Sequence, residues 1–63
     1  MQYLTSREKE VLKLIIQGNS NPKIAQMLNI TVYTVKAHLQ SIFNKLNVKN
    51  RVQAAVLAAK MFC

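Results

Sequence analysis

The sequence predicts an all-α fold, a four-helix bundle formed by a single domain of 63 residues. Apolar residues recur at helical spacing in four successive segments, and the alternation that is typical of strands is absent. Residue types that commonly cap helices precede these segments: Thr5, Ser20 or Asn21, Thr31 and Asn50. A chain this short buries only about 60% of the surface that its unfolded form exposes, so we expect its stability to be modest.

The charge balance favours a polyanionic partner. Nine lysines and arginines stand against two acidic residues, which gives a net charge of +7 and an isoelectric point of about 10.1. Such a balance suits either nucleic acid or an acidic membrane surface. The longest apolar run, residues 54–59, is far shorter than the ~20 residues that a membrane-spanning helix needs.

The residues that catalysis or metal binding would need are missing. The sequence has no Asp, and Glu8 and Glu10 stand two positions apart, so they point in different directions on a helix. One His and one Cys cannot form a zinc site, which takes three or four protein ligands. We therefore expect no enzyme activity, no cofactor and no metal. Cys63, at the last position, permits no internal disulfide and indicates a reducing compartment.

The first helix begins at a capping box. Thr5 and Glu8 fit the T-x-x-E pattern, in which each side chain accepts a hydrogen bond from the other residue's amide. We expect the helix to end at Gly18, which adopts the left-handed conformation without steric cost. Its apolar face comprises Val11, Leu12, Ile15 and Ile16.

The next two helices form a helix-turn-helix. A short helix over residues 22–28 stops around Asn29, and Thr31 caps a longer helix over about residues 32–46. The apolar face of the longer helix comprises Val35, Leu39, Ile42 and Leu46, with Phe43 at its edge. The outward face comprises Tyr33, Lys36, Ala37, Gln40 and Asn44. Because this face lacks the mixed Glu and Lys of an ordinary solvated helix, we interpret it as a binding surface.

The fourth helix, from Asn50 to about Phe62, is apolar nearly all round. We expect one face to pack on the bundle, namely Val52, Ala55, Val56 and Ala59. The other side carries Ala54, Leu57, Ala58 and Met61. Because so small a chain cannot cover both sides, we expect a second copy to cover these four residues and form a homodimer. The alternative is that a missing partner domain docks on Leu57 and Met61.

From residue 4 to residue 60, the chain resembles the LuxR-type (GerE-like, NarL/FixJ) DNA-binding domain of bacterial transcription factors. The matching segments follow one another in the order and spacing of the family: LTSREKEVLKLIIQG, SNPKIAQMLNIT, TVKAHLQSIFNKLNV and NRVQAAV. The chain departs from the family pattern at Pro22-Lys23, where Lys/Glu-Glu is usual, and at Asn47, where Gly is usual.

The resemblance implies a regulator of transcription whose third helix enters the major groove of double-stranded DNA and whose fourth pairs two copies on two half-sites. It implies a cytoplasmic, nucleoid-associated bacterial protein, with RNA polymerase as a further candidate partner. Family members usually carry an upstream receiver or ligand-binding domain. Since the capping box begins only four residues after Met1, we expect residues 1–63 to be a C-terminal domain cut from a longer regulator, with a small stand-alone regulator as the alternative.

The predicted DNA contacts lie on the third helix and at the helix starts. The first turns of a recognition helix reach base edges, so the predicted base contacts are Tyr33, Lys36, Ala37 and Gln40. Lys36 can donate to guanine and Gln40 can pair with adenine. The predicted contacts to the DNA backbone are Ser20, Asn21, Lys23, Thr31, Thr34, Asn44 and Lys45, with Lys49 and Arg51 as further candidates.

Alternative interpretations remain open at several of these positions. Lys36 can be a solvated lysine, and we expect His38 to be a half-buried packing residue. Arg51 can stabilise the start of the fourth helix or pair with Glu8 or Glu10. A competing function is a protein-interaction module that no longer reads DNA, although Lys36 and the small Ala37 speak against it. A membrane-binding role fits poorly, because the apolar residues serve a packed bundle.

Overall fold

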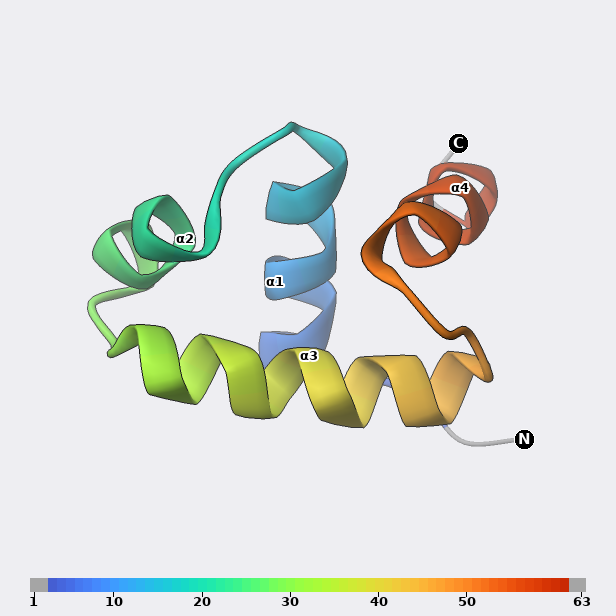
Figure 1. Ribbon diagram of the computed structural model, residues 1–63, viewed down its shortest axis with the longest axis horizontal. Coiled ribbons are helices and arrows are strands. Elements are labelled where there is room, and N and C mark those ends of the chain that lie inside the picture. Colours follow the sequence, from blue (N-terminus) through green and yellow to red (C-terminus); the bar gives the residue numbers. More distant parts are fainter. Residues whose placement is uncertain (1–2, 62–63) are drawn as a thin grey trace.

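The structure, a computed structural model, describes residues 3–61, and these form four helices and no strands (Figure 1). The helices are α1 (Ser6–Ile16), α2 (Asn21–Leu28), α3 (Val32–Leu46) and α4 (Arg51–Met61). α1 packs against the other three, while α2 and α4 pack against opposite ends of the long α3. The all-α prediction is confirmed, and the predicted range of the third helix agrees with α3.

The helix ends follow the capping chemistry that the sequence predicts. The Thr5 hydroxyl accepts from the Glu8 amide at 3.1 Å, and the Glu8 carboxylate accepts from the Thr5 amide at 2.8 Å. Asn29 and Asn47 end α2 and α3 in the left-handed conformation, with φ of 57° and 56°. Asparagine tolerates this conformation better than most residues, so the lack of glycine at position 47 does not disturb the fold.

The core lies where α1 and α3 meet, with α2 and α4 closing it on either side. Its buried apolar residues are Val11, Leu12, Ile15, Ile24, Ala25, Val35, Leu39, Ile42, Ala54 and Ala58. Phe43 and Leu46 pack against this cluster and are partly buried. Ala25 is small where α2 crosses α3, and its carbonyl accepts the Ile30 amide at 2.9 Å across the turn. These contacts fix the angle between the two helices of the helix-turn-helix.

The fourth helix is rotated relative to the prediction. Ala54 and Ala58 are 0% exposed, so the chain's own core covers them, and the prediction that they lie in a dimer interface is wrong. Val52 and Val56, predicted to be core, are 72% and 55% exposed. The small alanine side chains let α4 approach α1 closely, which leaves the bulkier valines on the outside. Within the described residues α4 ends at Met61; the predicted end at Phe62 and the thiol of Cys63 lie outside them.

Glu8 ties α1 to α3 with a buried carboxylate. Its Oε2 accepts from the Ser41 hydroxyl at 2.6 Å, and its Oε1 accepts from the Lys45 ammonium at 2.7 Å. Burial by itself raises the pKa of Glu8, but the hydrogen bonds from Lys45, Ser41 and the Thr5 amide, together with the Lys45 charge, lower it to about 2. The charged form of Glu8 is therefore part of the folded structure at neutral pH.

We predict that the free energy of unfolding falls as the pH drops from about 4.5 towards 2. The pKa of Glu8 is about 2 in the folded chain against an ordinary value of 4.5, so the unfolded chain takes up the proton first. The stabilisation is thus complete above pH 4.5 and is lost below it, by up to about 3 kcal/mol. Urea titrations from neutral pH down to about pH 2 measure this loss.

The Glu8→Gln variant isolates this group from the other carboxyls. We expect the variant to be less stable at neutral pH and its stability to depend less on pH in the acid range, because no Glu8 proton is then taken up. Parallel stability curves for the two proteins would contradict the assignment.

Candidate nucleic-acid interface

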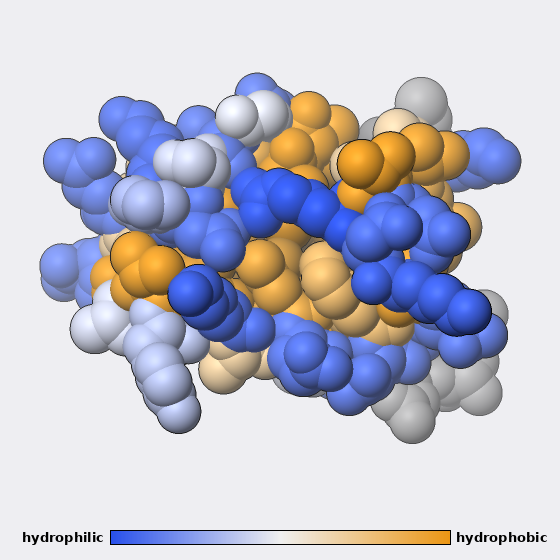
Figure 2. All heavy atoms as spheres, in the orientation of Figure 1, coloured by the Kyte–Doolittle hydropathy of each residue, from blue (hydrophilic) through white to orange (hydrophobic). Residues whose placement is uncertain are grey.

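The outward face of α3 is uncovered along its length. Lys36, Ala37, Gln40 and Asn44 are all exposed, and Tyr33 at its start is 83% exposed. The opposite side of the same helix is buried in the core through Val35, Leu39 and Ile42. α3 is therefore held by one side and presents a continuous polar and small-residue surface on the other. In the view of Figure 2, hydrophilic residues surround the apolar interior, and hydrophobic residues gather over α4.

Two contacts with Glu8 set the rotation of α3 about its own axis. Ser41 and Lys45 lie one turn apart on the flank of α3 that faces α1, and both donate to the same carboxylate. His38, on the boundary between the buried and exposed sides, is half-buried as predicted. A rotation of α3 about its axis would break both polar contacts and expose its apolar side. The fold therefore fixes which residues of α3 face outwards.

The starts of α2 and α3 bring further hydrogen-bonding groups to the same part of the molecule. The hydroxyls of Ser20 and Thr31 accept from the amides of Lys23 and Thr34, at 3.3 and 3.1 Å. Ser20, Lys23 and Thr31 are exposed, whereas Thr34 is half-buried and its hydroxyl lies 2.9 Å from that of Thr31. Neither helix has an acidic residue in its first turn. Both helix starts therefore keep the partial positive charge of their amide groups.

Some cationic side chains are paired with a carboxylate of the same chain, and others are not. Glu8 pairs with Lys45 and Glu10 pairs with Arg7 at 3.9 Å, so both side-chain carboxylates of the sequence are engaged. Lys23 and Lys36 are exposed, and within residues 3–61 neither lies within ion-pair distance of a carboxylate. Lys45 is half-buried against Glu8, which argues against the DNA backbone contact that we predicted for it. The charges of Lys23 and Lys36 are thus available to a ligand.

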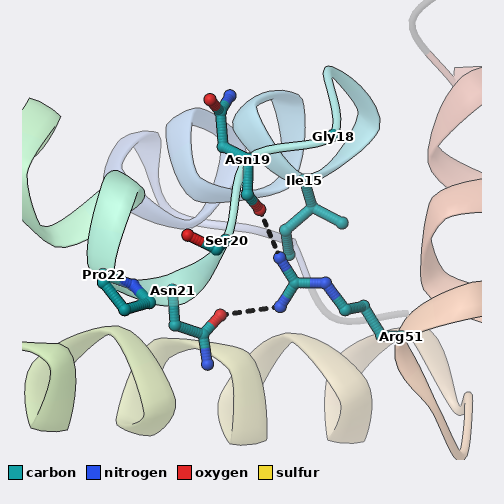
Figure 3. Close-up of a pocket in the computed structure, with 7 residues that line it drawn as sticks. All are labelled: Ile15, Gly18, Asn19, Ser20, Asn21, Pro22 and Arg51. Carbon is teal, nitrogen blue, oxygen red and sulfur yellow. Dashed lines mark hydrogen bonds between the residues drawn. The ribbon is translucent and has the colours of Figure 1, made fainter.

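Arg51 joins the start of α4 to the loop before α2 (Figure 3). One guanidinium nitrogen donates to Oδ1 of Asn21 at 2.6 Å and the other to the carbonyl of Asn19 at 2.5 Å. The alternative in which Arg51 pairs with Glu8 or Glu10 does not hold, because both glutamates have other partners. Arg51, Asn19 and Asn21 line a shallow cleft together with Ile15, Gly18, Ser20 and Pro22.

The contacts of Glu8 with Ser41 and Lys45 were not predicted, although the sequence indicates that Glu8 needs a partner. Glu8 precedes Val11, Leu12 and Ile15 by three, four and seven positions, so it lies on the apolar face of α1. A charged side chain on such a face is buried and needs a partner. The identity of that partner depends on how α3 crosses α1, which spacing along one helix does not define.

The described residues contain neither a candidate metal site nor a candidate membrane span. Within residues 3–61, no group of three His, Cys, Asp or Glu side chains is arranged to hold a metal ion. None of the helices α1–α4 is long and apolar enough to span a bilayer. What the structure does present is a helix-turn-helix with an uncovered second helix and cationic surroundings, which defines the nucleic-acid-binding class of small helical domains.

Comparison with known proteins identifies the family. Residues 2–58 match the family described as bacterial regulatory proteins, luxR family. Over 55 residues the chain is 51% identical to the transcriptional regulatory protein LiaR of Bacillus subtilis, a match that covers 87% of this chain and 26% of LiaR. Over 54 residues it is 50% identical to the nitrate/nitrite response regulator protein NarP of Escherichia coli, covering 86% of this chain and 25% of NarP.

A solved structure gives the same result. The crystal structure of the response regulator ChrA of a heme-sensing two-component system superposes on this fold with a TM-score of 0.87 at 44% identity. The match covers 97% of this chain and 30% of ChrA. The chain therefore belongs to the luxR family of bacterial regulatory proteins. It spans about a quarter of the length of the curated relatives it matches.

Proposed function

We propose that this domain binds double-stranded DNA in a sequence-specific manner, with α3 in the major groove and two copies paired through α4 on two half-sites. The observation that carries the proposal is the uncovered outward face of α3, which holds exposed donors and a small residue while its other side is fixed in the core. An α-helix fits the width of the major groove, where each base pair presents a distinct pattern of donors and acceptors.

Base reading falls to the first half of α3. Lys36 donates to guanine O6 and N7, and Gln40 pairs with the donor and acceptor of adenine. Ala37 stands between them and allows the helix to approach the bases closely. Tyr33 projects at the entry of the helix, where its exposed ring reaches the groove edge. Each good base contact contributes about 1–3 kcal/mol of discrimination.

Contacts with the DNA backbone come from the helix starts. Ser20, Asn21 and Lys23 at α2 and Thr31 and Thr34 at α3 place hydroxyl, amide and ammonium groups beside amide-rich helix ends, which suit phosphate oxygens. Asn44 lies more than a turn beyond Gln40, towards the backbone at the far edge of the groove. Lys49 is exposed and remains a further candidate, whereas the ion pair with Glu8 removes Lys45 from this set.

The dimer contact lies on the exposed side of α4. Val52, Val56 and Ala59 recur at helical spacing and are exposed, so they form an apolar strip that a second copy can cover. Leu57 is half-buried and Met61 is exposed, and both lie on the other side of α4, where they line a pocket together with Leu4 and Leu46. A two-fold axis through the strip places two α3 helices on one DNA molecule, as symmetric half-sites require.

The relatives that are named as response regulators are more than three times as long as this chain. We include in the proposal that residues 1–63 are the DNA-binding domain of a regulator that has an upstream receiver or ligand-binding domain in its full-length form. That upstream domain would receive the signal, while the helices described here act on DNA.

The proposal predicts salt-sensitive binding to duplex DNA. If each copy neutralises about three phosphates, a plot of log affinity against log salt has a slope of about −5 for the dimer. Fluorescence anisotropy with a duplex selected from a random library, repeated over a range of salt concentrations, measures this slope. Binding to no duplex at low salt would refute the proposal and favour a protein-interaction module.

The Lys36→Ala variant tests base reading. We expect its affinity for the selected duplex to fall by about 1–3 kcal/mol and its affinity for a mixed-sequence duplex to change much less. Lys23→Ala is the matched control, because it removes one exposed lysine at a predicted phosphate contact and should weaken both complexes alike. An equal loss from the two variants on both duplexes would show that Lys36 does not read a base.

A neutral double variant, Val52→Ser with Val56→Ser, tests the dimer contact. Both side chains are exposed in the single copy, so we expect the unfolding midpoint to stay near that of the original chain. Affinity for a duplex with two half-sites should fall at least severalfold, because the apolar contact between copies is lost. Affinity for a single half-site should not change. Equal affinity of the variant and the original chain for both duplexes would rule out this strip as the interface.

A further inference from the structure

Arg51 makes the polar connection between two helices that do not otherwise meet. Within residues 3–61, α2 and α4 do not pack against each other directly. Arg51 is the first residue of α4, and its guanidinium reaches Asn19 and Asn21, which precede and begin α2. The two contacts span 32 and 30 positions of sequence. The planar fork of arginine presents two donors in fixed geometry, which a lysine cannot reproduce.

The loop that Arg51 holds is also anchored to α1. The side-chain amide and the backbone amide of Asn19 both donate to the Leu14 carbonyl, at 2.9 and 3.1 Å. Asn19 thereby connects α1 to Arg51 on α4, and Asn21 connects Arg51 to α2. One guanidinium thus links three helices at the point where the chain enters the helix-turn-helix (Figure 3).

The contact decides which way the Asn21 amide faces. Arginine has donors only, so the group that it meets on Asn21 must be the amide oxygen. The Asn21 nitrogen therefore points away from Arg51, as Figure 3 shows. This nitrogen donates to no group within residues 3–61, and it is not sealed from solvent. Asn21 consequently keeps two N–H donors for a ligand, close in sequence to the exposed side chains of Ser20 and Lys23.

We propose that Arg51 is a positioning residue for DNA binding, whose guanidinium holds the Asn21 amide so that its nitrogen donates to a DNA phosphate. The inference rests on the proposed function, since it assigns a role within the same DNA complex. It differs from a direct phosphate contact by Arg51, because it assigns the guanidinium to Asn19 and Asn21 and the phosphate contact to the Asn21 nitrogen. Arg51 acts through orientation, and its charge adds to the positive field around the loop.

A double-mutant cycle on Arg51 and Asn21 tests the inference. Arg51→Lys keeps the charge and removes the fork, and Asn21→Ala removes the oriented donor. Affinity for a labelled mixed-sequence duplex two helical turns long is measured at low salt and at a temperature where every variant is folded, since phosphate contacts do not depend on sequence. We expect each single variant to bind about three- to tenfold more weakly, and the double variant no more weakly than Asn21→Ala alone.

Asn50→Ala is the control for a purely structural role. It removes the cap of α4, in which Asn50 accepts from the Gln53 amide at 2.9 Å, without touching the Asn19–Asn21 loop. We expect this variant to lower the unfolding midpoint and to leave DNA affinity unchanged.

Three results would overturn the inference while the proposed function stands. Arg51→Lys binding as tightly as the original chain would show that charge alone matters, and multiplying losses in the double variant would show that the two residues act independently. A loss from Asn50→Ala equal to that from Arg51→Lys would reduce Arg51 to a stabiliser of α4. Absence of DNA binding by the unaltered chain would instead remove the proposed function, and this inference with it.

Discussion

The arrangement of the domain depends on one buried carboxylate. Glu8 closes the capping box of α1 and, with the same two oxygens, receives Ser41 and Lys45 from α3. Removal of Ser41 or Lys45 would leave the buried carboxylate of Glu8 without one of its partners, and this costs more free energy than the contact itself contributes. The start of α1 and the rotation of α3 are thus fixed by a single group. Because the rotation of α3 decides which of its side chains face outwards, a residue of α1 governs what the outward face of α3 presents.

Local rules were sufficient for most of the fold. The capping residues Thr5, Ser20 and Thr31 and the left-handed asparagines 29 and 47 act through neighbours within a few positions, and the structure has them as predicted. The apolar side of α3 is bounded by polar residues, so its periodicity indicates one buried face. On α4 apolar residues occur on both sides, and periodicity cannot choose between them. The close approach of α4 to α1 selects the alanines for the inside, and that approach is a property of the packed bundle.

The sequence predicts which side chains of the candidate site are exposed, but it does not predict which residues the long cationic side chains pair with. The helical spacing of one segment was enough to predict that four side chains face outwards, namely Tyr33, Lys36, Ala37 and Gln40. The partners of Lys45 and Arg51 depend on the distances between helices, because these distances determine which groups a long side chain reaches. Arg51 meets neutral acceptors although the sequence offers two carboxylates. The comparisons show the family, and the contacts of individual residues with DNA stay predictions.

The pairing of both glutamates with cations of the same chain has a consequence for how the domain meets a polyanion. Glu8 is buried and Glu10 lies beside Arg7, so the net charge of +7 dominates the electrostatic field of the domain, and its encounters with any polyanion are accelerated over long range with little dependence on sequence. A domain with this charge is retained near a duplex and can move along it, but it also spends time bound to unrelated sequences. If the domain reads sequence as proposed, discrimination between sequences then depends more on how fast it leaves a wrong site than on how fast it reaches one. An acidic surface on another domain would weaken binding to DNA of any sequence.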